Sequence, residues 1–262
     1  MNRRSTPLIV ANWKMQLGIE ESHQRLTDLK QRLKTVRGRY QTVVCPSFVA
    51  LSGMKKFLRG SAIQLGAQDV FWDDRGAYTG EVSPLNLREA GVEYVLIGHS
   101  ERRQLVGETD EMVGRKVISA LGHGLTPILC VGETAHQRND GRHELIVTRQ
   151  LTAALRTAPP SSGQGRLYIA YEPVWAIGTG EPAGVEVAQT MREVIRQTLI
   201  ELYSPAQVDQ SFRFLYGGSV DADNVSQYVN AAAYHGALVG TASLDPEKFA
   251  MLISHITKEF NA

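Results

Sequence analysis

Short apolar runs recur along the chain and alternate with longer amphipathic segments. The apolar runs are continuous, without strict alternation of apolar and polar residues, which is typical of parallel strands covered on both faces. We therefore expect eight buried strands, at residues 8–12, 42–45, 63–68, 94–98, 127–132, 167–172, 212–217 and 236–240.

The intervening segments have helical periodicity. In 20–36, Leu26, Leu29 and Leu33 fall on one face, and 184–203 shows a similar pattern. Eight strand–helix units without a linker fit either a closed barrel or a doubly wound open sheet. The unit count favours the barrel, so we predict an α/β fold in which residues 1–262 form one (β/α)8 domain.

One Pro-, Ser- and Gly-rich stretch interrupts this alternation, at 158–165. It is short and lies between a predicted helix and a predicted strand, so we interpret it as a surface loop.

Composition and charge exclude several classes of function. The 28 Lys and Arg residues nearly balance 27 Asp and Glu, which gives a net charge of +1 and no basic field for nucleic acid or an anionic membrane. The N-terminal apolar run is too short for an export signal or a membrane span. Cys45 and Cys130 lie in or beside apolar runs without metal-ligand spacing, so we expect no metal and a reduced, cytoplasmic protein.

Polar and ionisable residues cluster where the predicted strands end. Active sites of (β/α)8 barrels lie at the carboxyl ends of the strands, so these residues are candidates for one site. They are Asn12, Lys14, His99, Ser100, Glu101, Glu133, Glu172 and Ser219.

Two late stretches are suited to hold a phosphate group. The segments 216–220 (YGGSV) and 239–243 (VGTAS) follow the seventh and eighth strands, where barrels commonly bind phosphate through main-chain N–H groups. Lys14 adds a compact positive charge for an anionic substrate, although a lysine standing alone there would be interpreted as solvated.

The segment AYEPVWAIGTGEPA, at 170–183, predicts a catalytic base beneath a lid. Glu172 closes a strand, Pro173 begins a stiff turn, and Gly178 and Gly180 flank a flexible end. A carboxylate that loses water under an apolar lid is a stronger base for abstracting a proton from carbon. His99, at the start of a predicted helix, meets a dipole that favours the neutral imidazole, which donates a hydrogen bond.

Six segments, taken in order, resemble the signature segments of the triosephosphate isomerase family, and the resemblance covers nearly the whole chain. YEPVWAIGTG and IGHSERR are the most specific. The six are ANWKM (11–15), AYTGEVS (77–83), IGHSERR (97–103), YEPVWAIGTG (171–180), YGGSV (216–220) and GALVGTASL (236–244).

The resemblance implies interconversion of dihydroxyacetone phosphate and glyceraldehyde 3-phosphate through an enediolate, a step of glycolysis and gluconeogenesis, without cofactor. It assigns Glu172 as base and His99 as electrophile, Asn12 and Lys14 as the substrate-binding pair, and Glu101 as the carboxylate beside Lys14. Ser100 begins the helix that favours neutral His99. The implied phosphate grip comprises Gly178, Ser219, Gly240 and the N–H of Thr241.

The AYTGE segment resembles the family's loop that reaches into a neighbouring subunit. A homodimer is therefore implied, with Thr79 near the partner's active site.

Position 241 departs from the family pattern, because the family usually has a second glycine where this chain has Thr241. If φ there is positive, a β-branched residue is costly; if φ is negative, the N–H is kept and a hydroxyl is gained. We expect the second case. A paralogue acting on a tetrulose phosphate is the close alternative function, and a catalytically silent barrel that binds a phosphorylated metabolite is a remote one.

Overall fold

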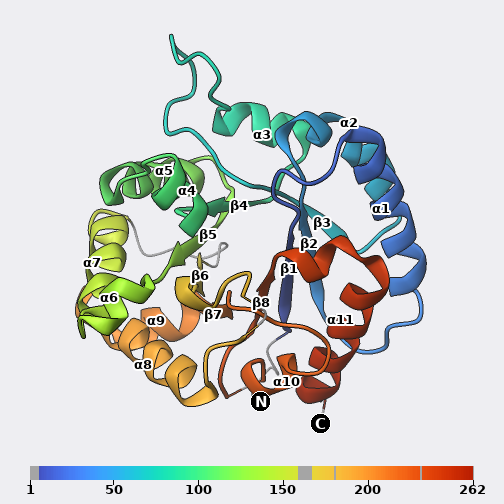
Figure 1. Ribbon diagram of the computed structural model, residues 1–262. Coiled ribbons are helices and arrows are strands. Elements are labelled where there is room, and N and C mark those ends of the chain that lie inside the picture. The colour runs from blue at the N-terminus through green and yellow to red at the C-terminus, as the bar shows by residue number, and fades with distance from the viewer. Residues whose placement is uncertain (1–5, 159–166, 180, 231, 262) are drawn as a thin grey trace.

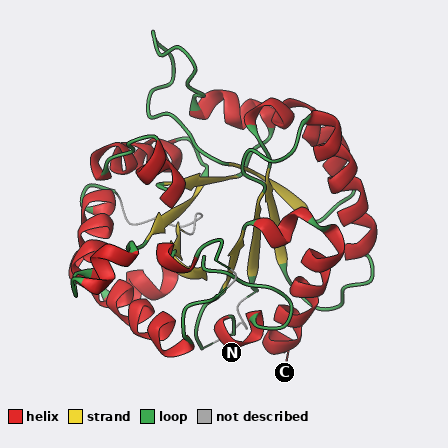
Figure 2. Cartoon of the chain, in the orientation of Figure 1, coloured by secondary structure: helices red, strands yellow, loops and turns green. Residues whose placement is uncertain are grey.

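The computed structural model describes residues 6–158, 167–179, 181–230 and 232–261. Its strands close into a parallel barrel in the order β1-β2-β3-β4-β5-β6-β7-β8, with helices around the outside (Figures 1 and 2). The predicted (β/α)8 barrel is thereby confirmed. The strands are β1 (Leu8–Asn12), β2 (Gln41–Cys45), β3 (Ile63–Ala67), β4 (Tyr94–Ile97), β5 (Thr126–Val131), β6 (Leu167–Tyr171), β7 (Phe212–Tyr216) and β8 (Gly236–Val239).

Each predicted strand is present, with ends shifted by no more than one residue. The predicted helix 20–36 is α1 (Ile19–Leu33), and 184–203 is α8 (Val185–Leu202). The remaining helices are α2 (Phe48–Leu58), α3 (Pro84–Ala90), α4 (Ser100–Leu105), α5 (Asp110–Gly122), α6 (Ala135–Asn139), α7 (His143–Leu155), η1 (Val174–Ala176), α9 (Pro205–Ser211), α10 (Val225–Tyr228), η2 (Thr241–Leu244) and α11 (Pro246–Asn261).

Alternate strand residues point to the two sides of the barrel wall. Leu8 and Val10 belong to an apolar cluster formed by one set of strand residues, whereas Ile9 and Ala11 pack in the larger cluster that includes the helices. Because side chains alternate along a strand, the first set fills the barrel interior. Residues continuing this inward series beyond the strand ends must point into the mouth of the barrel.

Barrel closure joins β1 to β8, with Leu8 opposite Gly236. A Cβ atom at position 236 would lie 1.8 Å from the Leu8 carbonyl oxygen, so only glycine fits this approach. The closure brings the loops after β1 and β8 together on one edge.

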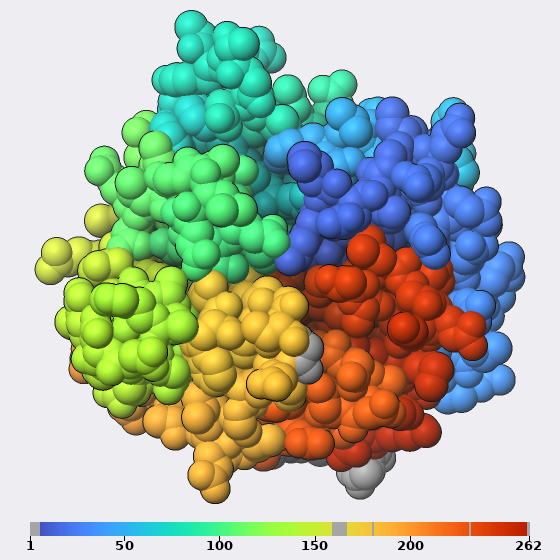
Figure 3. All heavy atoms as spheres, viewed as in Figure 1, coloured from blue at the N-terminus to red at the C-terminus, as the bar shows by residue number. Residues whose placement is uncertain are grey.

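The segment between β3 and α3 projects from the body of the molecule (Figures 1 and 3). It contains Thr79, which is exposed. Most of the predicted loop 158–165 lies outside the described residues, as does Gly180. Among the helices that the structure describes, none is long and apolar enough to cross a membrane.

Candidate active site

The end of β1 places Asn12 and Lys14 at the mouth of the barrel. Asn12 continues the inward series of Leu8 and Val10, is 5% exposed, and accepts a hydrogen bond at Oδ1 from the Lys14 N–H, at 3.0 Å. Lys14 has a φ of 51°, the only positive φ of a non-glycine residue in the described part of the chain. Its Nζ lies 2.6 Å from Oε1 of Glu101.

His99 caps the N-terminus of α4, as its place in the sequence predicted. Its Nδ1 accepts a hydrogen bond from the Glu101 N–H at 3.2 Å. A ring nitrogen that accepts a hydrogen bond carries no proton, so this contact belongs to the neutral tautomer with its proton on Nε2. The Nε2–H is then free to donate toward the cavity.

Glu172 follows β6 directly and continues the inward series of Tyr168 and Ala170. It is 2% exposed. Its Oε1 lies 3.1 Å from His99 Nε2, and its Oε2 accepts a hydrogen bond from the Ser100 N–H at 2.9 Å. The carboxylate and the imidazole that the sequence assigned to one site are therefore in direct contact.

A cavity of about 640 Å³ joins this pair to the loops after β7 and β8. Ser100 and Glu101 stand behind it, in contact with Glu172 and Lys14 respectively. The predicted site residues that line it are Asn12, Lys14, His99, Glu172, Gly178, Ser219, Gly240 and Thr241.

The loop after β7 leaves room for the Glu172 side chain. A Cβ atom at position 217 would lie 3.0 Å from Cγ of Glu172 and 3.0 Å from the Tyr171 carbonyl oxygen. Such a contact is tighter than ordinary van der Waals packing, so glycine at 217 keeps this side of the carboxylate open.

Thr241 begins the short helix η2, and its φ is not positive, since Lys14 alone among described non-glycine residues has a positive φ. The structure therefore agrees with the second case predicted for this position. The β-branched side chain meets no left-handed strain, and Thr241 is exposed on the wall of the cavity.

The segment after Glu172 is fastened to Glu133, which is fully buried at the end of β5. The Val174 N–H donates to the Glu133 carbonyl oxygen at 3.1 Å, and Trp175 Nε1 donates to Oε1 at 2.8 Å. Arg138 Nε and the Tyr171 hydroxyl donate to the same Oε1, at 2.7 and 3.1 Å. Burial, followed by the Glu133 charge, raises the pKa of Tyr171, so this hydroxyl remains a donor.

Downstream, Gly178 has a φ of 74° and is exposed. That backbone conformation favours glycine, and it lies at the opposite end of the segment from the stiff turn at Pro173. The described part of the predicted lid thus has one end bound to Glu133 and an exposed end at the cavity.

Two features were missed by the sequence analysis. Gln68 follows β3 and donates from Nε2 to the Lys14 carbonyl oxygen, at 2.7 Å. It is the next residue after a strand, so the rule that selected the other candidates could have found it.

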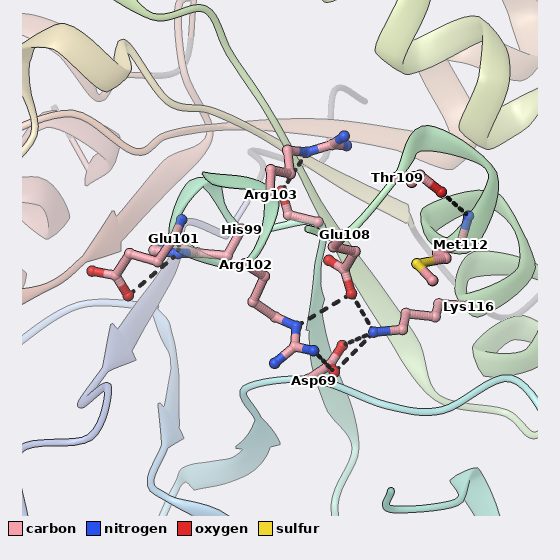
Figure 4. Close-up of polar contacts among 10 residues, drawn as sticks. Asp69, His99, Glu101, Arg102, Arg103, Glu108, Thr109, Met112 and Lys116 are labelled. Atoms are coloured by element: carbon pink, nitrogen blue, oxygen red, sulfur yellow. Dashed lines mark hydrogen bonds and ion pairs between the residues drawn. The ribbon is translucent and has the colours of Figure 1, made fainter. Parts of the chain in front are cut away.

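The second feature is a buried charged network behind α4 (Figure 4). Lys116 Nζ donates to Asp69 Oδ1 at 2.7 Å and contacts Glu108, while Arg102 reaches Asp69 at 2.9 Å and Glu108 at 3.2 Å. Of these four residues only Arg102 lies in a quoted signature segment (97–103), and nothing in the sequence pattern pairs it with Asp69, Glu108 or Lys116. The network ties α4, which carries Ser100 and Glu101, to α5 and the loop after β3.

Comparison with known proteins agrees with this geometry. The family model described as triosephosphate isomerase matches residues 7–256. A protein of Pelobacter propionicus named triosephosphate isomerase is 48% identical over 249 residues, 95% of this chain and 98% of that protein. Proteins of the same name from Roseiflexus sp. and Thermoanaerobacter sp. are 47% and 45% identical, over 95% of this chain and 96% and 99% of their own lengths.

A parallel barrel whose mouth joins a buried carboxylate, a neutral histidine and a lysine beside glycine-rich loops defines an aldose–ketose isomerase. The matches extend over nearly the whole chain, and the resemblance predicted from its signature segments is confirmed. The chain belongs to the triosephosphate isomerase family.

Proposed function

We propose that this protein interconverts dihydroxyacetone phosphate and D-glyceraldehyde 3-phosphate. The observation that carries the proposal is the 3.1 Å contact between Glu172 Oε1 and His99 Nε2 on a cavity whose other wall is formed by the loops after β7 and β8. The tetrulose phosphate isomerase and the silent barrel find no support in the comparisons, which agree on one family name.

The reaction begins when Glu172 removes a proton from the hydroxymethyl carbon next to the carbonyl. In the described position its carboxylate is held by Ser100 and His99, so it must leave these partners to reach a bound substrate. The substrate carbonyl takes over the Nε2–H of His99. When the His99 Nε2–H donates to the substrate carbonyl oxygen in place of Glu172, the carboxylate is freed to act as base and the carbonyl is polarised.

The electrons of the broken C–H bond form an enediolate, which carries negative charge that the ketone does not. Donors aimed at its oxygens from His99, Lys14 and Asn12 stabilise this charge more than they stabilise the ground state. His99 moves a proton between the two enediolate oxygens, and Glu172 returns its proton to the neighbouring carbon to give the aldehyde. No organic cofactor or metal enters this scheme.

Main-chain N–H groups near Ser219, Gly240 and Thr241, together with Gly178 of the lid, hold the phosphate. Closure of the lid, whose described residues are 173–179, excludes water and keeps the enediolate from losing phosphate by elimination. The exposed Gly178, at the end of the segment away from the Glu133 contact, supports this motion.

We further propose a cytoplasmic homodimer that works in glycolysis and gluconeogenesis. The projecting loop after β3 and the exposure of Thr79 support insertion of this loop beside the partner's Asn12 and Lys14.

The proposal is tested by assaying purified protein side by side on three- and four-carbon aldose phosphates. We expect glyceraldehyde 3-phosphate to be the preferred substrate, with turnover well above about 1 per second, the low end of the usual enzyme range. Turnover at or below that rate, or a preference for the four-carbon substrate, would count against it.

A further inference from the structure

Gln68 joins three neighbouring strands at the mouth of the barrel. It follows β3, and its Nε2 donates to the Lys14 carbonyl oxygen at 2.7 Å and to the Cys45 carbonyl oxygen at 3.0 Å. Cys45 ends β2, and its carbonyl also accepts the Trp13 N–H at 3.1 Å. We propose that Gln68 is a positioning residue that holds Lys14 in its substrate-binding conformation.

Lys14 needs such support because its backbone is strained. A φ of 51° in a non-glycine residue is sparsely populated, costs about 1–3 kcal/mol, and persists only where neighbouring contacts fix it. Lys14 is fixed on both sides: its N–H is bound by Asn12 Oδ1 and its carbonyl oxygen by Gln68 Nε2.

The backbone conformation decides where the ammonium group lies. Lys14 Nζ is 2.6 Å from Glu101 and borders the cavity beside Gly240, where a Cβ atom would lie 3.7 Å from it. If the Lys14 carbonyl lost its donor, φ would relax toward negative values and the side chain would leave this position. Gln68 thus affects ligand binding through Lys14. The expected effect of Gln68 on kcat/KM rests on the proposed isomerase function.

The test replaces Gln68 by methionine, which has a similar length and no donor. The hydrogen bond to the Lys14 carbonyl contributes about 1 kcal/mol to holding this conformation, so we expect its loss to lower kcat/KM about fivefold. The affinity for inorganic phosphate, measured by calorimetry, should fall in parallel. Gln68→Glu keeps the shape of the side chain but loses the N–H donor, so it should show the same losses of kcat/KM and phosphate affinity. It replaces the methionine variant in the test if that variant folds poorly.

Gln64→Met is the matched control. Gln64 lies on β3, the strand that Gln68 follows, but its Nε2 donates to Glu93 at 3.1 Å in an exposed position. This variant should retain both phosphate affinity and kcat/KM, because its contact does not reach Lys14.

A double-mutant cycle separates positioning of Lys14 from general support of the fold. In a Lys14→Met background no ammonium group remains to be positioned, so Gln68→Met should have no further effect on phosphate affinity. A further loss as large as that in the wild-type background would overturn the proposal. So would unchanged phosphate affinity in Gln68→Met, or a loss that sedimentation shows to come from subunit dissociation.

The phosphate measurement does not depend on turnover. If wild-type protein fails to isomerise triose phosphates but loses phosphate affinity on Gln68→Met, the proposed function fails and the positioning role stands.

Discussion

At the scale of single residues, the length of one side chain sets the reaction geometry. Glu172 reaches both the Ser100 N–H and His99 Nε2 from a backbone position fixed at the end of β6. In the proposed reaction the same reach delivers its carboxylate to a substrate carbon, and proton transfer requires close contact.

Glu172→Asp should therefore cut kcat sharply, by at least about 100-fold, because the carboxylate is withdrawn by one methylene from the reacting carbon. Steady-state kinetics measures the loss, and circular dichroism should show an unchanged fold. Glu181→Asp, an exposed carboxylate beyond the lid, is the matched control and should keep full activity. An unaltered rate in Glu172→Asp would exclude Glu172 as the base.

Thr241 offers a second test. Where the family usually has glycine, this chain has a side chain with a hydroxyl donor on the cavity wall. A hydrogen bond from this hydroxyl to a charged phosphate is worth about 1.5 kcal/mol or more. Thr241→Val, of nearly equal shape, should raise KM about tenfold, whereas Thr241→Ser should leave it near the wild-type value. Equal KM values for the two variants would show that the hydroxyl takes no part in binding.

At the scale of elements, the lid is a segment with one strong anchor. Glu133 Oε1 accepts hydrogen bonds from Trp175, Arg138 and Tyr171, and the Glu133 main chain holds Val174. Trp175 is the one of these three donors that lies in the lid, so its bond contributes to the described position of the lid.

Trp175→Phe removes that bond and keeps an aromatic ring. The lid conformation seen in the structure loses about 1 kcal/mol of stabilisation relative to the closed conformation. The equilibrium between the two therefore shifts toward the closed lid. We expect a severalfold lower KM and, where release of product is limiting, a lower kcat. Tyr203→Phe removes a half-buried hydroxyl that donates to the Leu155 carbonyl oxygen, away from the lid, and should change neither constant. A raised KM in Trp175→Phe would contradict the anchoring role.

The elements and the ends of the strands were predictable because continuous apolar runs mark buried parallel strands. Glu172 could be placed from its position after LYIAY alone. The contacts of Glu133 and Gln68 could not, since they join segments far apart in the chain: Trp175 and Glu133 are 42 residues apart, and Gln68 and Lys14 are 54 apart. Their partners are set by the order of the strands around the barrel, which a linear pattern does not record.

At the scale of the whole molecule, a buried charged network links the barrel to its helices. Asp69 is 4% exposed, and burial raises its pKa to about 6, although Lys116 and Arg102 oppose this shift. Burial, assisted by the nearby negative charge of Glu108, outweighs the two cations because the carboxylate has left water almost completely.

This shift predicts a pH-dependent stability. The pKa of Asp69 is raised from 3.8 to about 6, so the folded state holds the proton more tightly and the stabilisation is present at low pH. It is lost as pH rises through about 6. The free energy of unfolding of wild type relative to Asp69→Asn should fall by up to about 3 kcal/mol between pH 4 and 7.

Urea unfolding across this pH range measures the difference, with exposed Asp223→Asn as control. A relative stability of wild type that increases with pH would reverse the sign and show that the cations, and not burial, dominate.

The proposed homodimer would cover an apolar side chain that a single subunit leaves exposed to water. Met15 follows the strained Lys14 directly and is 94% exposed. In the proposed dimer the partner would cover this apolar side chain, which lies next to the residue that the inserted loop would approach. Met15→Glu would bury a charge in that interface, so it should dissociate the dimer and reduce activity together.

Sedimentation should then show a mass falling from twice 28.9 kDa to 28.9 kDa, because the introduced carboxylate keeps its water only in the monomer. Met251→Glu is the matched control: Met251 lies on α11, 49% exposed, and should stay dimeric and active. A Met15→Glu protein that remains dimeric would place the interface elsewhere. One that dissociates with full activity would show that each barrel completes its site without Thr79 of its neighbour.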